Sequence, residues 1–240
     1  MAASVVGSTS GSTAAALNLT LTYPAGIVTG DLVLCIITFR ANGTTSSTLT
    51  PPTGFTQIDA AYSTVSGTTF MTWSGYKYDS AGGTAASVSA TTCYSWSILR
   101  VSGAPASAPF GATPLLGTQV GPDTTRTANS PTATSSGTGL AVRVYTSRIA
   151  DTTGVNASWT AGTGHTEVTD TTSTALTSAN VSQETTVETV PSGATVARTS
   201  TELLSGASTA SNTSQVGLIL LLDAAGAAAA IRFRSVGKFT

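Results

Sequence analysis

The feature that most constrains the fold is a period-two alternation of apolar and polar residues. In segment 17–23, Leu and Tyr occupy every second position and Asn or Thr the positions between. This pattern predicts a half-buried strand. Segment 32–37 is continuously apolar after a Gly-Asp turn signal, which suits a central strand covered on both faces. Further strands are expected near 55–60, 68–78, 85–90, 93–102, 116–120, 130–135, 139–148, 165–172, 180–190, 194–199 and 215–223.

About a dozen short strands separated by Gly, Pro and Asp turns are typical of an all-β protein. Hydrophobic residues form 40% of the chain, which is enough to build a core. Charged residues form only 9%, far fewer than in an ordinary soluble domain. The fold class predicted is therefore all-β, a β-sandwich or jelly-roll-like fold built from two similar halves.

The two halves of the chain resemble each other in sequence. Residues 49–58 align with 159–168 at an offset of 110, and residues 32–38 align with 140–146 at an offset of 108. The same order continues with two further matched pairs, 80–84 with 191–195 and 97–101 with 218–222. Either two small sandwiches are joined near 105–115, or two halves share one core. Because neither half has many large side chains, one shared core is favoured.

The domain organisation that follows has three parts. Residues 1–16 are expected to form an N-terminal arm, and 17–223 the sandwich, with halves at 17–104 and 115–223. Residues 224–240 are expected to form a C-terminal arm, although a frayed terminus is an equal alternative. The basic and aromatic side chains of this tail are candidates for docking on a partner: Ile231, Arg232, Phe233, Arg234, Lys238 and Phe239.

Two cysteines and one histidine are interpreted as structural. Cys35 and Cys93 lie in apolar segments, and buried free thiols are favoured over an immunoglobulin-type disulfide. An immunoglobulin domain would have a Trp soon after its first Cys and a Tyr two residues before its second. This chain has no Trp soon after Cys35, and it has Thr91 at the position of the Tyr. His165 takes the place of Phe55 in the alignment of the halves, so packing or a turn is favoured over a ligand role.

The sequence offers no recognisable catalytic motif, so no catalytic, cofactor-binding or metal-binding residues are predicted and the chain is interpreted as a non-enzyme. A pair of catalytic carboxylates is the one kind of active site that the sequence does not exclude, because folding and not sequence spacing brings such carboxylates together. Most lie beside Gly, Ser or Thr, where solvated turn roles are expected. The carboxylates considered are Asp31, Asp59, Asp79, Glu167, Asp170, Glu184 and Glu188.

Charge and hydropathy exclude several partners. A formal net charge of -1 gives no reason to bind nucleic acid or anionic lipid. The longest apolar run, 216–222, is far shorter than the roughly 20 residues of a membrane helix, so a buried strand is expected. The start lacks the pattern of a secretory signal, which predicts synthesis in a cytoplasm.

Aromatic residues give two expectations. Trp73 and Trp96 lie in apolar strands and are expected to fill the space between sheets. Tyr76 and Tyr78 flank Lys77 and are candidates for a glycan-stacking surface.

Four motifs together resemble a pattern common in virion proteins of tailed bacteriophages. They are Y-P-A-G at 23–26, G-D-L-V-L at 30–34, P-P-T-G-F-T at 51–56 and W-S-G-Y-K-Y at 73–78. Phe55 stands where that pattern usually has Trp, and the last motif is stretched. The resemblance covers mainly 17–104 and implies a β-sandwich virion component, without catalytic residues or cofactors.

The leading expectation is a capsid decoration or cement protein, located in the virion and forming a homo-oligomer. Its expected partners are the major capsid protein or other virion proteins, contacted through an edge strand or the terminal arms. The alternative is a tail or baseplate receptor-binding module that contacts host glycans. A carbohydrate-binding module of an extracellular enzyme is a third, weaker interpretation.

Overall fold

A computed structural model describes the chain at residues 2–41, 49–65, 68–78, 85–106, 109, 115–120, 125–135, 137–150, 156–173, 179–205 and 214–222. All secondary structure in these residues is β-strand, which confirms the all-β prediction. The strands of the first half are β1 (Ser4–Thr20), β2 (Leu32–Ala41), β3 (Leu49–Thr50), β4 (Thr56–Val65), β5 (Thr68–Tyr78) and β6 (Ala85–Ser102).

The second half contributes the remaining strands. They are β7 (Leu115–Val120), β8 (Thr125–Asn129), β9 (Thr134–Ser135), β10 (Gly139–Ala150), β11 (Ala157–Ala161), β12 (Thr166–Thr172), β13 (Ala179–Val190), β14 (Gly193–Ala194), β15 (Thr199–Leu204) and β16 (Ser214–Leu222). The described part of the chain contains no helix with the length and hydropathy needed to cross a membrane.

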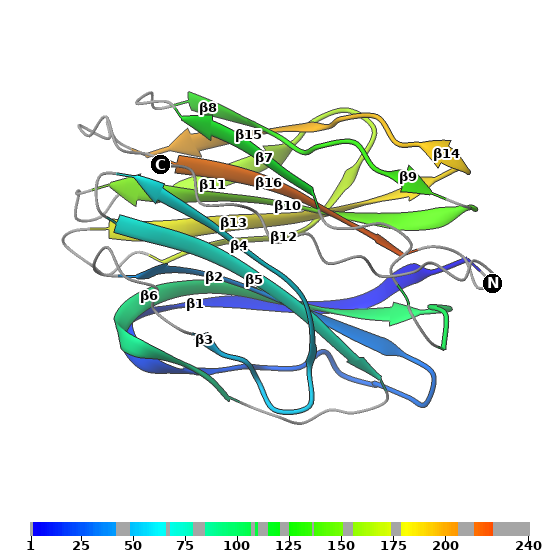
Figure 1. Cartoon of the computed structure of the whole chain (residues 1–240), viewed down its shortest axis with the longest axis horizontal. Coiled ribbons are helices and arrows are strands. Elements are labelled where there is room, and N and C mark those ends of the chain that lie inside the picture. Colours follow the sequence, from blue (N-terminus) through cyan, green and yellow to red (C-terminus); the bar gives the residue numbers. More distant parts are fainter. Residues whose placement is uncertain are drawn as a thin grey trace.

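Two antiparallel sheets form the sandwich. Sheet A has the order β1-β6-β2-β5-β4, with β3 also paired to β6, and sheet B has the order β12-β13-β10-β16-β7. A smaller sheet C, β11-β15-β8, covers the outer face of sheet B, and β9 pairs with β14. In Figure 1 the second half occupies the upper part of the view, with β8 and β15 outermost.

The two sheets have equivalent topology. Reading sheet B from β7 to β12 reproduces the order of sheet A from β1 to β4. Leu32 pairs with both Tyr78 and Val101, and Leu140, 108 positions later, pairs with residues 189 and 222 of the corresponding strands. Each sheet also has a bulge at the same place, between residues 57 and 59 in sheet A and between 167 and 169 in sheet B.

The turn before each bulge also repeats. Gly54 and Gly164 both adopt positive φ, 84° and 90°, in the aligned P-T-G and G-T-G segments. Positive φ favours glycine because it has no Cβ. The aligned segments of the two halves therefore share strand register, bulge and turn geometry.

The inner faces of the two sheets form one apolar core. The cluster contains Leu32, Leu34 and Ile36 of β2 together with Leu140 and Val142 of β10. Branched and long aliphatic side chains at every second position supply these faces, as the alternation predicted.

Towards the other end of the same interface, hydroxyl and amide groups replace the aliphatic side chains. Thr38 Oγ1 donates to Gln183 Oε1 at 2.8 Å, and Thr72 Oγ1 lies 3.2 Å from Thr146 Oγ1. In the alignment of the halves, Thr38 corresponds to Thr146 and Thr72 to Gln183. The two contacts are thus reciprocal, as in an isologous dimer interface.

The outer face of sheet A carries a second apolar cluster, which includes Trp73 and Trp96. The expectation that these rings fill the space between the sheets is wrong. Side-chain alternation places them on the opposite face, where loop residues of the same half, such as Ile27 and Phe55, pack over them.

The structure also differs from the expectations for the N-terminal arm and for two of the strands. Residues 4–16, expected in an N-terminal arm, belong to β1 and pair with β6. The strands expected at 130–135 and 194–199 are instead the short β9–β14 pair with extended backbone around it. The C-terminal arm, 224–240, lies outside the described residues.

Candidate functional site

The outer faces of the two sheets differ in chemistry although their strands correspond. At aligned positions, the first half has Cys35, Ile37 and Trp73 in an apolar cluster. The second half has Arg143, Tyr145 and Glu184 at those positions, all buried under sheet C. Burying polar groups is costly unless they are paired, so this layer between sheets B and C is a candidate functional site.

One part of the layer is an ion pair with almost no exposure to solvent. Arg126 Nη2 of β8 lies 2.7 Å from Glu202 Oε2 of β15, with side-chain exposures of 2% and 0%. Ser182 Oγ of β13 donates to Glu202 Oε1 at 2.6 Å, and Trp159 Nε1 of β11 donates to Ser182 at 3.1 Å. Charge-assisted hydrogen bonds therefore join sheet C to sheet B.

A second part is a carboxylate held by two guanidinium groups. Arg143 Nη2 of β10 donates to Glu188 Oε2 at 2.8 Å, and Arg198 contacts both oxygens of Glu188. Arg143 also donates to Ser130 Oγ at 2.6 Å and to the Val196 carbonyl at 3.0 Å. Although burial favours its neutral form, these donors lower the pKa of Glu188, so it stays ionised.

A third part is a row of side chains across three strands. Tyr145, Glu184 and Asp170 are directly opposite one another on β10, β13 and β12. Glu184 is fully buried, and neither of its oxygens has a hydrogen bond of ordinary geometry among the described residues. Burial raises the pKa of Glu184 to about 8; Glu167 and Asp170 add to this effect, and the Ser200 hydroxyl offsets part of it.

Asp170 is partly paired. Its Oδ2 accepts a hydrogen bond from the Trp159 backbone N–H at 2.9 Å. Burial nevertheless raises the pKa of Asp170 to about 6. Tyr145 is covered by Trp159 and His165, with ring centroids at 6.2 Å and 5.7 Å. Tyr145 and Glu184 are therefore fully buried, whereas Asp170, at the end of the row, keeps partial exposure.

His165 has a structural environment, as predicted. Its Nδ1 lies 2.7 Å from Thr186 Oγ1 and its Nε2 lies 3.2 Å from the Thr199 carbonyl. Burial lowers the pKa of His165, which favours the neutral ring. Both ring nitrogens are thus engaged within the fold. No group of three or more potential metal ligands occurs among the described residues.

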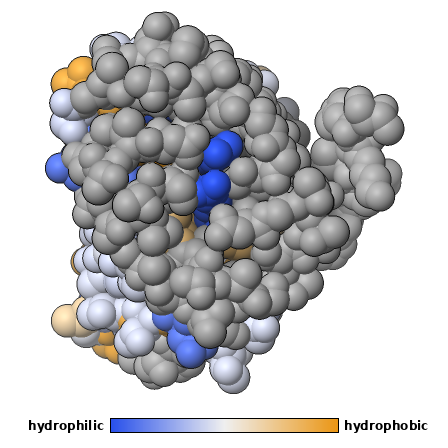
Figure 2. Space-filling model, turned by 90° about the vertical axis from the view of Figure 1, so that its left-hand side faces the viewer, coloured by the Kyte–Doolittle hydropathy of each residue, from blue (hydrophilic) through white to orange (hydrophobic). Residues whose placement is uncertain are grey.

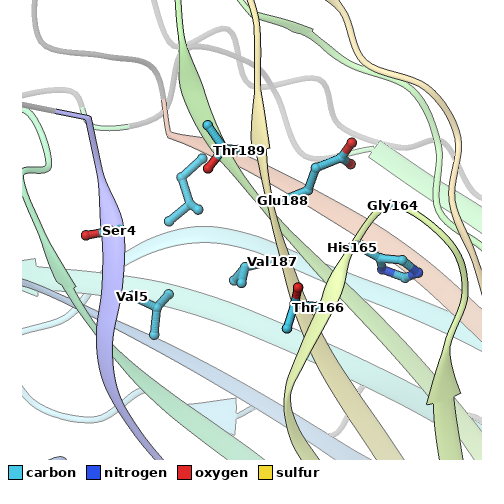
Figure 3. Close-up of a pocket in the computed structure, with 9 residues that line it drawn as sticks. Ser4, Val5, Gly164, His165, Thr166, Val187, Glu188 and Thr189 are labelled. Atoms are coloured by element: carbon cyan, nitrogen blue, oxygen red, sulfur yellow. The ribbon is translucent and has the colours of Figure 1, made fainter.

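A shallow pocket of about 400 Å³ opens beside this layer, between β1, β10, β13 and the turn before β12. Figure 3 shows Val5 and Val187 on the β1 side, with the His165 ring and the Glu188 carboxylate directed away from them. Glu188 is already bound by two arginines. The pocket therefore presents apolar side chains and hydroxyls and has no free acid–base pair.

The tyrosines proposed for glycan stacking lie elsewhere. Tyr76 and Tyr78 are half-buried and pack against the core between the sheets. Their rings meet edge-on at 5.9 Å, and the Tyr78 hydroxyl donates to the Pro105 carbonyl at 2.5 Å. This placement does not favour a stacking surface. The candidate docking residues 231–239 lie outside the described part of the chain.

The two cysteines are free and buried, which confirms the prediction. Cys35 belongs to the outer apolar cluster of sheet A. Cys93 alternates with the buried Ser95 and Ser97 that face sheet B. The two thiols therefore lie on opposite faces of sheet A and cannot form a disulfide with each other.

The remaining candidate site is the free edge of sheet A. β1 spans 17 residues, contains no charged residue and no Pro, and pairs only with β6 among the described strands. No residue from Ser4 to Thr13 is buried, and Val6 is 49% exposed. In the end-on view of Figure 2, the visible described residues are mostly near-neutral in hydropathy, with smaller hydrophilic and hydrophobic patches.

Comparisons of the chain with protein-family models, curated proteins and solved structures find no match.

Proposed function

We propose that this chain is a non-enzymatic structural protein of a tailed-bacteriophage virion, acting as a capsid decoration or cement protein. The single observation that carries the proposal is the β1 edge. Natural proteins usually protect long edge strands with charges, prolines or covering segments, because an open edge pairs with other chains. An uncharged edge of 17 residues suits a protein that is meant to bind another protein.

The use of charge in the fold supports a structural role. Seven of the described charged side chains form ion pairs, most of which join segments far apart in sequence: Asp31–Arg100, Arg126–Glu202, and Glu188 with Arg143 and Arg198. Paired charges of this kind rigidify layers and leave a surface rich in Ser and Thr. With a formal net charge of only -1, such a surface offers little charge repulsion to close packing against neighbouring proteins, as a shell component requires.

The sequence resemblance of residues 17–104 to virion proteins of tailed phages supports the proposed location. With the edge strand, it favours attachment to a capsid over a free enzyme or an extracellular module. The half-buried positions of Tyr76 and Tyr78 give the receptor-binding alternative no specific support.

The test is cryo-electron microscopy of particles produced by the genome that encodes the chain, together with a deletion of its gene. We expect sandwich-shaped density on the capsid, and deletion particles that release DNA at lower temperature. Absence of the chain from purified particles would refute the virion role. Density at the tail tip alone would refute the cement role.

A further inference from the structure

Four strands lie at the edges of the two main sheets, and only one of them is both long and uncharged. β12 carries Glu167 and Asp170, and β4 carries Asp59; both edges also contain a bulge. β7 has only six residues. Bulges, charges and short length are the usual protections of an edge strand. β1 also has register shifts, at 5–7 and 13–18, but the run between them is regular and uncharged, so β1 is the edge at which an added strand is favoured.

Within β1, the segment 7–13 has the regular geometry that strand addition requires. Its residues pair one by one with β6, from Gly7 opposite Arg100 to Thr13 opposite Tyr94, and the register shifts lie outside this run. Ser8, Ser10 and Ser12 are exposed.

The outer face of this run, by contrast, is occupied by the chain itself. The space above Gly11 is filled by the Trp96 ring, because a Cβ at Gly11 would lie 2.8 Å from it. Thr9 Oγ1 donates to the Thr22 carbonyl on the same side. A partner would therefore add at the edge of β1 and not on its outer face.

The sequence of this edge is symmetric about Thr9. Residues 7–11 read Gly-Ser-Thr-Ser-Gly, which is the same in both directions. In an antiparallel pair centred on Thr9, Gly7 is opposite Gly11 of the second strand and Ser8 is opposite Ser10. Every pair then combines small, uncharged residues, and the central pair is Thr with Thr, a favourable cross-strand combination.

We infer that β1 of one copy pairs antiparallel with β1 of a second copy, about a two-fold axis at Thr9. The two A sheets would then form one continuous sheet across the dimer, with main-chain hydrogen bonds providing the contact. This inference rests on the proposed function, because it names the partner of the edge that the proposal depends on. A strand of a different virion protein is the competing occupant.

The test is sedimentation equilibrium of the full chain over a range of concentrations. We expect wild type to shift from 23.9 kDa towards twice that mass as concentration rises. Ser8→Lys with Ser10→Lys places like charges opposite each other and should weaken self-association at least about tenfold. Ser8→Lys with Ser10→Glu places opposite charges together in the same register and should restore it.

The matched control is Thr125→Lys with Thr127→Lys, two exposed positions with the same spacing on β8, the edge strand of sheet C. It should associate like wild type, and thermal melts should show that all three variants fold. The inference is overturned if wild type stays monomeric, if the Lys/Lys variant dimerises like wild type, or if the Lys/Glu variant stays dissociated.

These outcomes are separable from the virion test. A chain present in particles but monomeric in solution would overturn the β1 dimer and leave the virion role intact. A chain that dimerises through β1 but is absent from particles would refute the virion role alone.

Discussion

Replacing Glu184 with Gln should stabilise the protein at neutral pH and remove much of its pH dependence. In the unfolded chain this carboxyl titrates near its ordinary value of 4.5, whereas in the folded protein burial raises its pKa to about 8. Between these values, folding requires uptake of a proton. The free energy of unfolding that Glu184 contributes is therefore largest below pH 4.5 and falls as pH rises towards 8.

The size of the effect follows from the two pKa values. Each pH unit within this window changes the free energy of unfolding by about 1.4 kcal/mol, so wild type should lose about 3 kcal/mol between pH 5 and pH 7 through this group. Gln has nearly the same shape and does not titrate. Glu184→Gln should thus exceed wild type by about 3 kcal/mol at pH 7 and match it near pH 4.5.

The assay is denaturant unfolding at pH 5, 6, 7 and 8, followed by Trp fluorescence, because Trp159 packs over Tyr145 in this layer. Taking the difference between variant and wild type isolates the titration of Glu184 together with that of Asp170, whose charge is coupled to it. Glu167→Gln is the comparison variant: this exposed carboxylate on β12 contributes to the raised pKa of Glu184, so its removal should reduce the pH dependence only in part, whereas Glu184→Gln should remove it. A difference between Glu184→Gln and wild type that stays constant with pH would refute the reasoning.

Three further predictions concern packing and pairing. Arg126→Met should destabilise the protein by about 3–5 kcal/mol in chemical denaturation, because it leaves the buried Glu202 carboxylate without its ion pair; a smaller loss in the Arg126→Met/Glu202→Met double variant would show that the pairing is responsible. Gly11→Ala should cost about 1–3 kcal/mol, since its Cβ would overlap the Trp96 ring, whereas Gly7→Ala, whose nearest neighbour is at 3.5 Å, should be nearly neutral in the same thermal melts. Mass spectrometry should find both thiols unreactive towards iodoacetamide until the protein unfolds, since burial raises the pKa of both; they are Cys35 and Cys93.

Much of the sandwich could be predicted because its buried positions are apolar. β2 and β10 present aliphatic side chains at every second position. The sequence alignment of the halves matched these two strands to each other, and their registers in the two sheets correspond. Sheet C could not be predicted by the same means. In β15, Ser200 and Glu202 are buried while Leu203 is 54% exposed, which reverses the usual relation between hydropathy and burial.

The candidate sites divide in the same way. The structural character of His165 followed from its alignment with Phe55. The buried row of Tyr145, Glu184 and Asp170 did not, because a carboxylate beside Thr and Ser resembles a solvated turn until the strand that covers it is placed. Assigning Trp73 to the wrong face of sheet A has a related cause, since an apolar strand buried on both faces does not reveal which face meets the other sheet.

The reciprocal contacts of Thr38 with Gln183 and of Thr72 with Thr146 have a consequence for how the chain folds. All described strand pairings join strands of the same half, so sheet A can close within residues 4–102 and sheet B within 115–222. The late, long-range step is then the docking of one finished sheet on the other. Because hydroxyls line part of both docking faces, each sheet exposes less apolar surface to water before docking, which reduces its tendency to aggregate.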